Sequence, residues 1–202
     1  MSKVTSQISM SLDGYVAGPD PSLEDPLGIR GEDLHTWMFE AAREGRAEDQ
    51  RLRAEISAGV GAYVMGRKMF DGGEGPLDES WHGWWGEDPP YHVPVFVLTH
   101  HPRESLPMQG GTTFHFVTEG FDAALAQARA AAGDRDVHVC GGASAVQQAL
   151  RAGQLDELFL HTTPIFLGGG TRLFEDVADP RLEVIETIHS PATTHVRYRV
   201  VR

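Results

Sequence analysis

Two apolar segments of this chain run directly into glycine and then into a helical pattern. Val137–Gly142 and Ala62–Gly66 are both strand-like runs that end in glycine, and a helix is expected after each. A buried strand that turns through glycine into a helix is a unit of α/β proteins. Strands and helices alternate first, and strands dominate the end of the chain. The sequence therefore predicts an α/β fold with a mixed sheet, in one domain over residues 1–202.

The remaining elements follow from hydrophobic periodicity and from turn residues. Further strands are expected at Val4–Met10, Val95–Thr99, Phe114–Thr118, Leu158–Leu160, Leu182–His189 and His195–Val201, and helices at Leu34–Ile56, Asp122–Ala132 and Ser144–Ala152. Gly45 lowers the helix propensity in the middle of the first of these helices. Asp122 is the expected N-cap of the second and Gly133 its stop signal. Residues 71–94 are expected to form a long loop.

Composition excludes several classes of function. The 17 basic and 29 acidic residues give a formal net charge of −12, whereas nucleic-acid binding needs a basic surface. One cysteine cannot form a disulfide framework. We find no apolar leader and no run long enough for a membrane span, and we expect a soluble, cytoplasmic protein.

The acidic residues are concentrated in one part of the chain. Residues 20–90 contain 16 acidic and 7 basic residues, a net charge of −9, and the rest contains 13 and 10, a net charge of −3. Outside residues 20–90 an anionic ligand therefore meets less repulsion.

Several common motifs can be rejected. Gly61–Lys68 has the glycine spacing of a P-loop, but Arg67 and Lys68 replace its Lys and Ser/Thr, and its intervening residues are strand-like. We find neither a dinucleotide-binding G-x-G-x-x-G after a strand nor metal-ligand spacing among the histidines. Ser144 lacks the second glycine of a nucleophile elbow.

The two glycine turns remain as candidate phosphate sites. Gly141–Ser144 combines glycines with a helix start, whose N–H groups favour an anion. Gly66 is followed by two cations, Arg67 and Lys68, which suit charge-assisted hydrogen bonds to phosphate. Two separate anion sites fit a dinucleotide with an extra 2′-phosphate. They also fit coenzyme A, or a nucleotide together with a phosphorylated substrate.

Short motifs along nearly the whole chain resemble the dihydrofolate reductase superfamily. They are Ser11–Gly18 (SLDGYVAG), Val64–Lys68 (VMGRK), Pro94–Thr99 (PVFVLT), Gly141–Ser144 (GGAS), Leu155–Leu158 (LDEL) and Pro164–Gly170 (PIFLGGG). The first and the last two are most similar to the reductase domain of bacterial riboflavin biosynthesis and its stand-alone relatives. The resemblance implies a mixed, mostly parallel eight-stranded sheet flanked by helices, with NADPH bound across the strand ends, and a homodimer.

Carried over by position, the resemblance assigns residues to the cofactor. Gly66, Arg67 and Lys68 would hold the 2′-phosphate side, with assistance from Thr99 and His100. The pyrophosphate would lie on Gly141, Gly142, Ala143 and Ser144. Residues 11–18 would cover the nicotinamide, and the 34–56 helix would face the substrate.

The catalytic and substrate residues are less clearly assigned. Asp33 is the nearest match to the carboxylate that binds the pterin in dihydrofolate reductases, but a helix N-cap is the favoured role. Asp13 is a second catalytic candidate, or a turn residue that bonds to local backbone. Trp37 is a candidate substrate contact. Trp84 and Trp85 in the 71–94 loop are candidates for stacking on a planar substrate; the alternative is an ordered lid or dimer contact.

These features lead to the hypothesis of an NADPH-dependent reductase. The resemblance points to 5-amino-6-(5-phosphoribosylamino)uracil as the kind of substrate, and dihydrofolate is the alternative. A non-catalytic nucleotide-binding protein on the same fold is a further alternative.

Overall fold

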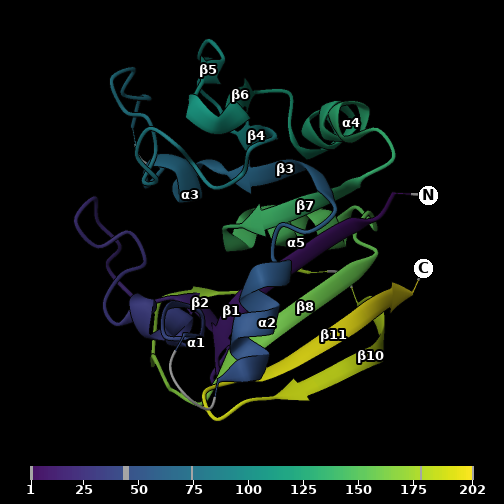
Figure 1. Ribbon diagram of the computed structural model, residues 1–202. Helices are drawn as coiled ribbons and strands as arrows, with labels where there is room; N and C mark the ends of the chain where they lie inside the picture. Colours follow the sequence, from purple (N-terminus) through teal and green to yellow (C-terminus); the bar gives the residue numbers. More distant parts are fainter. Residues whose placement is uncertain (1, 43–45, 74, 178, 202) are drawn as a thin grey trace.

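The computed structural model describes residues 2–42, 46–73, 75–177 and 179–201. In these residues a nine-stranded sheet has the order β10-β11-β8-β1-β7-β3-β4-β6-β5 (Figure 1). Its strands are β1 (Val4–Ser11), β3 (Val60–Gly66), β4 (Pro94–Leu98), β5 (Leu106–Pro107), β6 (Thr113–Val117), β7 (Asp136–Gly141), β8 (Glu157–Thr163), β10 (Arg181–His189) and β11 (Thr194–Val201). The expected mixed, mostly parallel sheet is thus confirmed, with the two-residue β5 as a strand beyond the expected eight.

Six neighbouring strands, from β8 to β6, run parallel. Every residue of β3 is buried, as expected for a central parallel strand covered on both faces. Because the strands share a direction, the segments that follow β1, β3, β4, β7 and β8 all begin at one edge of the sheet. This edge is where α/β proteins build ligand sites.

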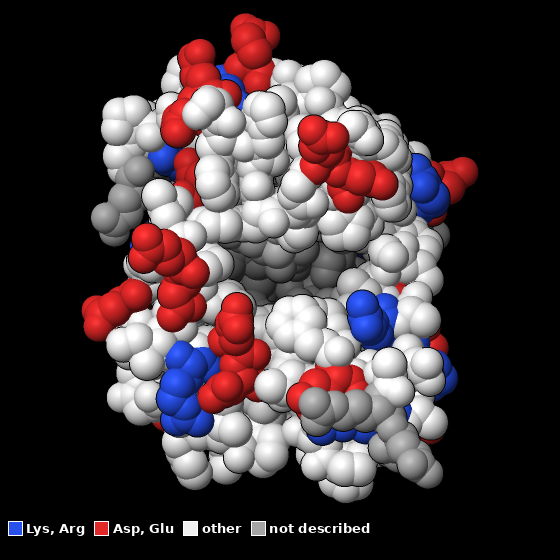
Figure 2. Space-filling model, turned by 60° about the vertical axis from the view of Figure 1, so that its left-hand side comes forward, with Lys and Arg blue, Asp and Glu red and all other residues white. Residues whose placement is uncertain are grey.

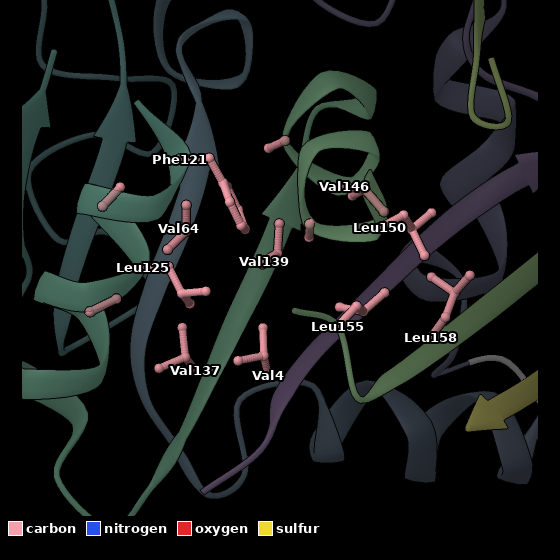
Figure 3. Close-up of a cluster of buried hydrophobic side chains, with 14 of the residues drawn as sticks. Val4, Val64, Phe121, Leu125, Val137, Val139, Val146, Leu150, Leu155 and Leu158 are labelled. Carbon is pink, nitrogen blue, oxygen red and sulfur yellow. The ribbon is translucent and has the colours of Figure 1, made fainter. Parts of the chain in front are cut away.

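One face of the sheet is covered by two helices, α4 (Phe121–Ala132) and α5 (Ala143–Arg151). The buried residues of α4 are Phe121, Ala124, Leu125, Ala128 and Ala132. This spacing places them on one side of the helix. Figure 3 shows Phe121 and Leu125 beside Val64 of β3 and Val137 and Val139 of β7. Leu150 of α5 and Leu158 of β8 lie farther along the same cluster, which is the largest apolar cluster of the described residues. This core fixes the starts of both helices at the sheet edge.

The opposite face is covered in two separate places. Near β8 and β11 lie α1 (Thr36–Phe39) and α2 (Ala47–Glu55), and η1 (Gly31–His35, a 3₁₀ helix) precedes α1 and contacts β1. Near β3, β4 and β6 lie α3 (Arg67–Asp71) and part of the long loop that follows it. In Figure 1, β1 and β7 lie between these two coverings.

Two local expectations are wrong. The single helix expected over 34–56 is divided into η1, α1 and α2, and Gly45 lies outside the described residues. Helix α4 begins at Phe121, and its N-cap is Gly120 rather than Asp122. Gly120 has a φ of 89°, which glycine adopts without strain, and Asp122 lies in the first turn, where its charge suits the helix dipole.

Candidate functional site

The two glycine turns predicted from the sequence meet at the carboxyl edge of the sheet. Strands β3 and β7 are neighbours, and Met65 pairs with Gly141. A Cβ atom added to Gly66 would lie 3.5 Å from the backbone nitrogen of Gly142 and 3.8 Å from Ser144 Oγ. The structure therefore brings Gly66 and Gly141–Ser144, two segments far apart in the sequence, into one site.

The start of α5 is open toward this site. Gly142 is its N-cap and makes no side-chain cap hydrogen bond, and a Cβ atom added there would find nothing within 4 Å. The peptide bond between Gly141 and Gly142 is cis. Ser144 is exposed and Ala143 is buried. Backbone N–H groups at an uncapped helix start favour an anion, so this turn can hold a phosphate group.

The two cations after Gly66 have different surroundings. Arg67 Nε donates to both carboxylate oxygens of Asp71, at 3.0 and 3.2 Å, and Nη1 donates to the carbonyl of Gly75 at 2.7 Å. Its side chain is 10% exposed. Lys68 is exposed. The predicted phosphate contact thus fits Lys68 directly, whereas Arg67 also ties α3 to the following loop.

Thr99 and His100 follow β4 at the same edge. Thr99 is buried, and its Oγ1 accepts a hydrogen bond from the backbone N–H of His101 at 3.1 Å, so it shapes the turn. His100 is exposed. Their predicted contact with the cofactor would therefore involve the His100 side chain or the turn backbone.

Asp13 connects the loop after β1 with the loop after β8. Its carboxylate accepts hydrogen bonds from Ser11 Oγ at 2.6 Å and from the backbone N–H groups of Leu167 and Gly168 at 3.2 and 2.8 Å. The hydrogen bond from Ser11, followed by those from the backbone, lowers the pKa of Asp13 to about 2. Asp13 does bond locally, as a turn residue would, but it also joins two loops that are 154 residues apart.

A short two-stranded sheet reinforces this connection. Strand β2 (Tyr15–Ala17) pairs with β9 (Thr171–Arg172). The guanidinium of Arg172 donates to the carbonyl of Asp13 at 3.1 Å and to the Tyr15 hydroxyl at 2.9 Å. The loop predicted to cover a nicotinamide is therefore held in place on both sides.

We expect the stabilisation from Asp13 to disappear in strong acid. A carboxyl group with a lowered pKa stabilises the folded state fully above its unfolded value near 3.8, and this stabilisation is lost as the pH falls through about 2. The urea midpoint of Asp13→Asn should lie below that of the parent at pH 5–7, and the two should converge near pH 2. Exposed Asp134→Asn, which also removes one charge, should show no such convergence. A midpoint difference for Asp13→Asn that is independent of pH would contradict this role.

Asp33 is not the N-cap that the sequence favours. It lies inside η1, and its Oδ2 accepts a hydrogen bond from Arg30 Nε at 3.1 Å, in an ion pair whose partners are about half exposed. The N-cap of η1 is Arg30, with a φ of 62°. The Asp33 carboxylate is therefore solvated and paired, and its predicted catalytic role remains a prediction.

The candidate substrate tryptophans belong to apolar clusters. Trp37 is 2% exposed, and its indole N–H donates to Ser9 Oγ at 2.9 Å. Trp85 packs on Tyr91 and Phe114, with ring centroids 5.1 and 5.9 Å apart. The ring of Trp84 meets that of Trp81 edge to face at 4.6 Å. The aromatic part of the 71–94 loop, residues 81–91, thus packs against the sheet. The face of Trp37 is not open to a ligand.

Between the two coverings, this side of the molecule is hollowed. Figure 2 shows the hollow at the height where Figure 1 places β1 and β7, with acidic side chains on its borders. Alternation along the strands turns Thr5 and Gln7 of β1 and His138 and Cys140 of β7 toward this face. Thr5, Gln7 and Cys140 are half-buried, and burial raises the pKa of the Cys140 thiol to about 12, so the thiol is protonated at neutral pH. The hollow therefore has a polar and unreactive floor.

Three buried residues near this face were not identified from the sequence. Asp49 of α2, His195 of β11 and His161 of β8 form a hydrogen-bonded chain between this helix and the sheet. These residues are 34 and 146 positions apart, so no short spacing motif connects them. Polar residues at strand positions that should be buried were the available signal.

The sheet order and the two glycine turns at its carboxyl edge define an α/β protein with a dihydrofolate reductase-like fold. The chain belongs to the RibD C-terminal domain family, whose family model matches residues 2–196.

Solved structures agree with this fold. A putative riboflavin biosynthesis protein from Shewanella sp. PV-4 is 24% identical over 99% of each chain, with a TM-score of 0.67. Dihydrofolate reductase from Enterococcus faecalis, complexed with NADP(H), is 14% identical over 99% of this chain and 97% of that one, with a TM-score of 0.61. The riboflavin biosynthesis reductase Rib7 of Saccharomyces cerevisiae is 15% identical over 100% of this chain and 89% of that one, with a TM-score of 0.56.

A search of curated proteins found no match. Among the described residues, none of the helices has the length and apolar character needed to cross a membrane. The same residues contain no group of three or more His, Cys, Asp or Glu that could hold a metal ion.

Proposed function

We propose that this protein is an NADPH-dependent reductase that transfers hydride to a small heterocyclic substrate of the ribosylamino-pyrimidine class. Membership of the RibD C-terminal domain family supports the reaction class. Two proteins of similar fold also support it: the reductase Rib7, and a Thermotoga maritima diaminohydroxyphosphoribosylaminopyrimidine deaminase/5-amino-6-(5-phosphoribosylamino)uracil reductase, of which this chain covers 57%.

The observation that carries the proposal is the meeting of two glycine turns at the open start of α5. A Cβ atom would find free space at Gly142, and Gly66 lies beside it. A pyrophosphate fits there because backbone N–H groups can approach it without side chains between. Lys68, with Arg67 and His100 nearby in the fold, would face the 2′-phosphate.

Each part of the chain has its own task in this proposal. The cofactor supplies the hydride when it is bound. The Asp13 network holds the 11–18 loop over the sheet edge, which orients the nicotinamide and limits the access of water. The hollow between α1 and the 71–94 loop would hold the substrate, and Trp84 and Trp85 of that loop are the candidates for stacking on it.

A non-catalytic nucleotide-binding role is the second candidate, because Asp33 is solvated and paired rather than buried at a substrate site. Oxidation of NADPH should be assayed with the ribosylamino-pyrimidine and with dihydrofolate. Turnover of the pyrimidine supports the proposal, and turnover of dihydrofolate alone would change the substrate class. Binding of NADPH without turnover of either would favour the non-catalytic role.

A homodimer and a cytoplasmic location remain predictions from the resemblance and the sequence.

We expect Lys68→Ala to weaken NADPH binding about tenfold and to leave NADH binding nearly unchanged. Loss of one charge-assisted hydrogen bond to a phosphate corresponds to roughly 1.5–3 kcal/mol, and partial exposure to solvent places the effect at the low end. Calorimetric titration of both cofactors measures it. Lys3→Ala is the matched control, because Lys3 lies at the opposite end of the strands and pairs with Glu157. Equal losses for the two cofactors would remove Lys68 from the 2′-phosphate site.

A further inference from the structure

Strand β1 carries polar side chains through the middle of the sheet. It lies between β8 and β7 and runs parallel to both. A parallel strand in such a position is expected to be almost wholly apolar. Instead, β1 contains five polar side chains, which are Thr5, Ser6, Gln7, Ser9 and Ser11. Polar groups inside a sheet need hydrogen-bond partners, from the protein itself or from a ligand.

Four of these five side chains find their partners within the protein. The partners of Thr5, Ser6, Ser9 and Ser11 are, in that order, the imidazole of His138, the carbonyl of Val139, the indole N–H of Trp37 and the carboxylate of Asp13. Among the described residues, the carboxamide of Gln7 has no hydrogen-bond partner, and none of its polar atoms is fully buried. One oxygen acceptor and two N–H donors of Gln7 are therefore available to a ligand.

Gln7 lies on the hollowed face of the sheet. Side chains alternate along a strand, so Gln7 shares this face with Thr5 and Ser9. Ser9 is buried and bonded to Trp37 of α1, whereas Gln7, two residues earlier, is half-buried. The exposed part of Gln7 therefore opens to the hollow that Figure 2 shows at the height of β1.

The floor around Gln7 consists of uncharged groups. His138 and Cys140 of the neighbouring strand β7 face the same hollow. Burial lowers the pKa of His138 to about 4 and raises that of Cys140 to about 12, so both side chains are neutral at pH 7. Because this floor offers no counter-charge, it favours a neutral polar ring over a phosphate or an ammonium group.

The carboxamide of Gln7 defines which ring edge fits this floor. A carboxamide presents a donor and an acceptor side by side. The lactam edge of a pyrimidinedione, C(=O)–N(H), presents an acceptor and a donor at matching positions, so the two groups can form a pair of hydrogen bonds. A carboxylate at the same place could only accept, and it would repel the lactam oxygen. Gln7 therefore suits a dioxopyrimidine ring.

We propose that Gln7 is a specificity-determining residue, whose carboxamide binds the lactam edge of a pyrimidinedione substrate in the hollow. This rests on the proposed reductase function and defines its substrate class more closely. Ser6 pairs with Val139, two residues before Gly141, so a ring bound at Gln7 lies close to the proposed pyrophosphate turn. The carboxamide of a nicotinamide has the same donor and acceptor groups, and the experiment separates the two ligands.

The first test measures binding in the full chain and does not depend on activity. The probes are 5,6-diaminouracil and 5,6-diamino-1,3-dimethyluracil, which lacks both ring N–H donors. Each is titrated by calorimetry, without and with saturating NADP⁺. The parent should bind the first probe at least tenfold more tightly, because methylation leaves the oxygen of Gln7 unpaired. Gln7→Met keeps the length of the side chain without its polar atoms, and should bind both probes within threefold of each other.

Two further variants serve as controls. Gln50→Met makes the same change on the exposed side of α2 and should leave both affinities within twofold of those of the parent. Gln7→Glu keeps the shape but loses the donors, and should bind 5,6-diaminouracil at least tenfold more weakly. Thermal unfolding shows whether each variant is folded. Unchanged discrimination in folded Gln7→Met, or a parent that binds neither probe, overturns the proposal. So does a Gln7→Met variant that loses NADPH affinity alone, which would assign the carboxamide to the nicotinamide.

Turnover separates failure of this inference from failure of the proposed function. With the ribosylamino-pyrimidine, Gln7→Met should raise KM at least tenfold and change kcat less than threefold, because the lactam contact is made equally in the ground state and the transition state. An unchanged KM in a folded Gln7→Met refutes the role of Gln7 alone. Absence of NADPH oxidation by the parent with any substrate refutes the reductase function, and the probe titrations then decide the role of Gln7.

Discussion

Replacement of Gly142 by valine should abolish most dinucleotide binding without unfolding the protein. Gly142 has a φ of −64°, which any residue adopts, and a Cβ atom there meets nothing within 4 Å, so we expect the folded structure to accept a side chain at this position. Its methyl groups would occupy the space over the start of α5 that a pyrophosphate needs. We expect NADPH and NADH affinity to fall at least 100-fold, equivalent to about 3 kcal/mol, with an unfolding free energy close to that of the parent.

Titration of both cofactors, with thermal unfolding of each variant, measures these effects. Ala130→Val, on the exposed side of α4, adds the same side chain away from the turns and should change neither affinity by more than twofold. A Gly142→Val protein that binds NADPH normally would show that the pyrophosphate does not lie at this turn. The prediction differs from that for Lys68, because both cofactors contain the pyrophosphate and only one contains the 2′-phosphate.

The turns at Gly66 and Gly142 could be predicted from the sequence because their signal is local. An apolar strand, a glycine and a helical pattern follow one another within ten residues in each case. That the two turns meet depends on the adjacency of β3 and β7, which the local pattern does not specify. The long loop over residues 71–94 and the strands of the second half are predictable for the same local reason.

The buried polar chain could not be predicted in this way. Asp49 lies on a helix with charged residues on most sides, and nothing near it in the sequence indicates that it is fully buried. Its partner His195 is 146 residues away, and only the antiparallel pairing of β11 with β8 brings His195 beside His161. Contacts of this kind depend on the tertiary arrangement, which a scan for spacing motifs does not address.

Side-chain contacts also changed the interpretation of residues that were correctly located. Arg67 follows Gly66 as expected, but its pairing with Asp71 gives it a structural task inside α3. The sequence offers a catalytic or a local role for Asp13, and its two backbone contacts to the loop after β8 show a third role. The position of a residue at an element boundary was predictable, whereas its partners were not.

Replacement of Trp37 by alanine should have the largest effect on stability. The indole is 2% exposed and packs on His161 and His195, with ring centroids 4.5 and 5.0 Å away. Truncation of a buried aromatic side chain to alanine costs about 3–5 kcal/mol, because apolar contact is lost and a cavity remains. We expect a loss of this size in the free energy of unfolding in urea.

Trp37→Phe divides this effect into packing and hydrogen bonding. It keeps a ring over His161 but removes the N–H that donates to Ser9 Oγ, so the expected loss is about 1–3 kcal/mol. Combined with Ser9→Ala, which removes the acceptor, it should cost less than the sum of the two single changes. Because Trp37 lies on α1 and the glycine turns follow β3 and β7, NADPH affinity should be nearly unchanged in folded Trp37→Phe. If Trp37→Ala lowers the free energy of unfolding by less than about 1 kcal/mol, this side chain does not hold α1 on the sheet.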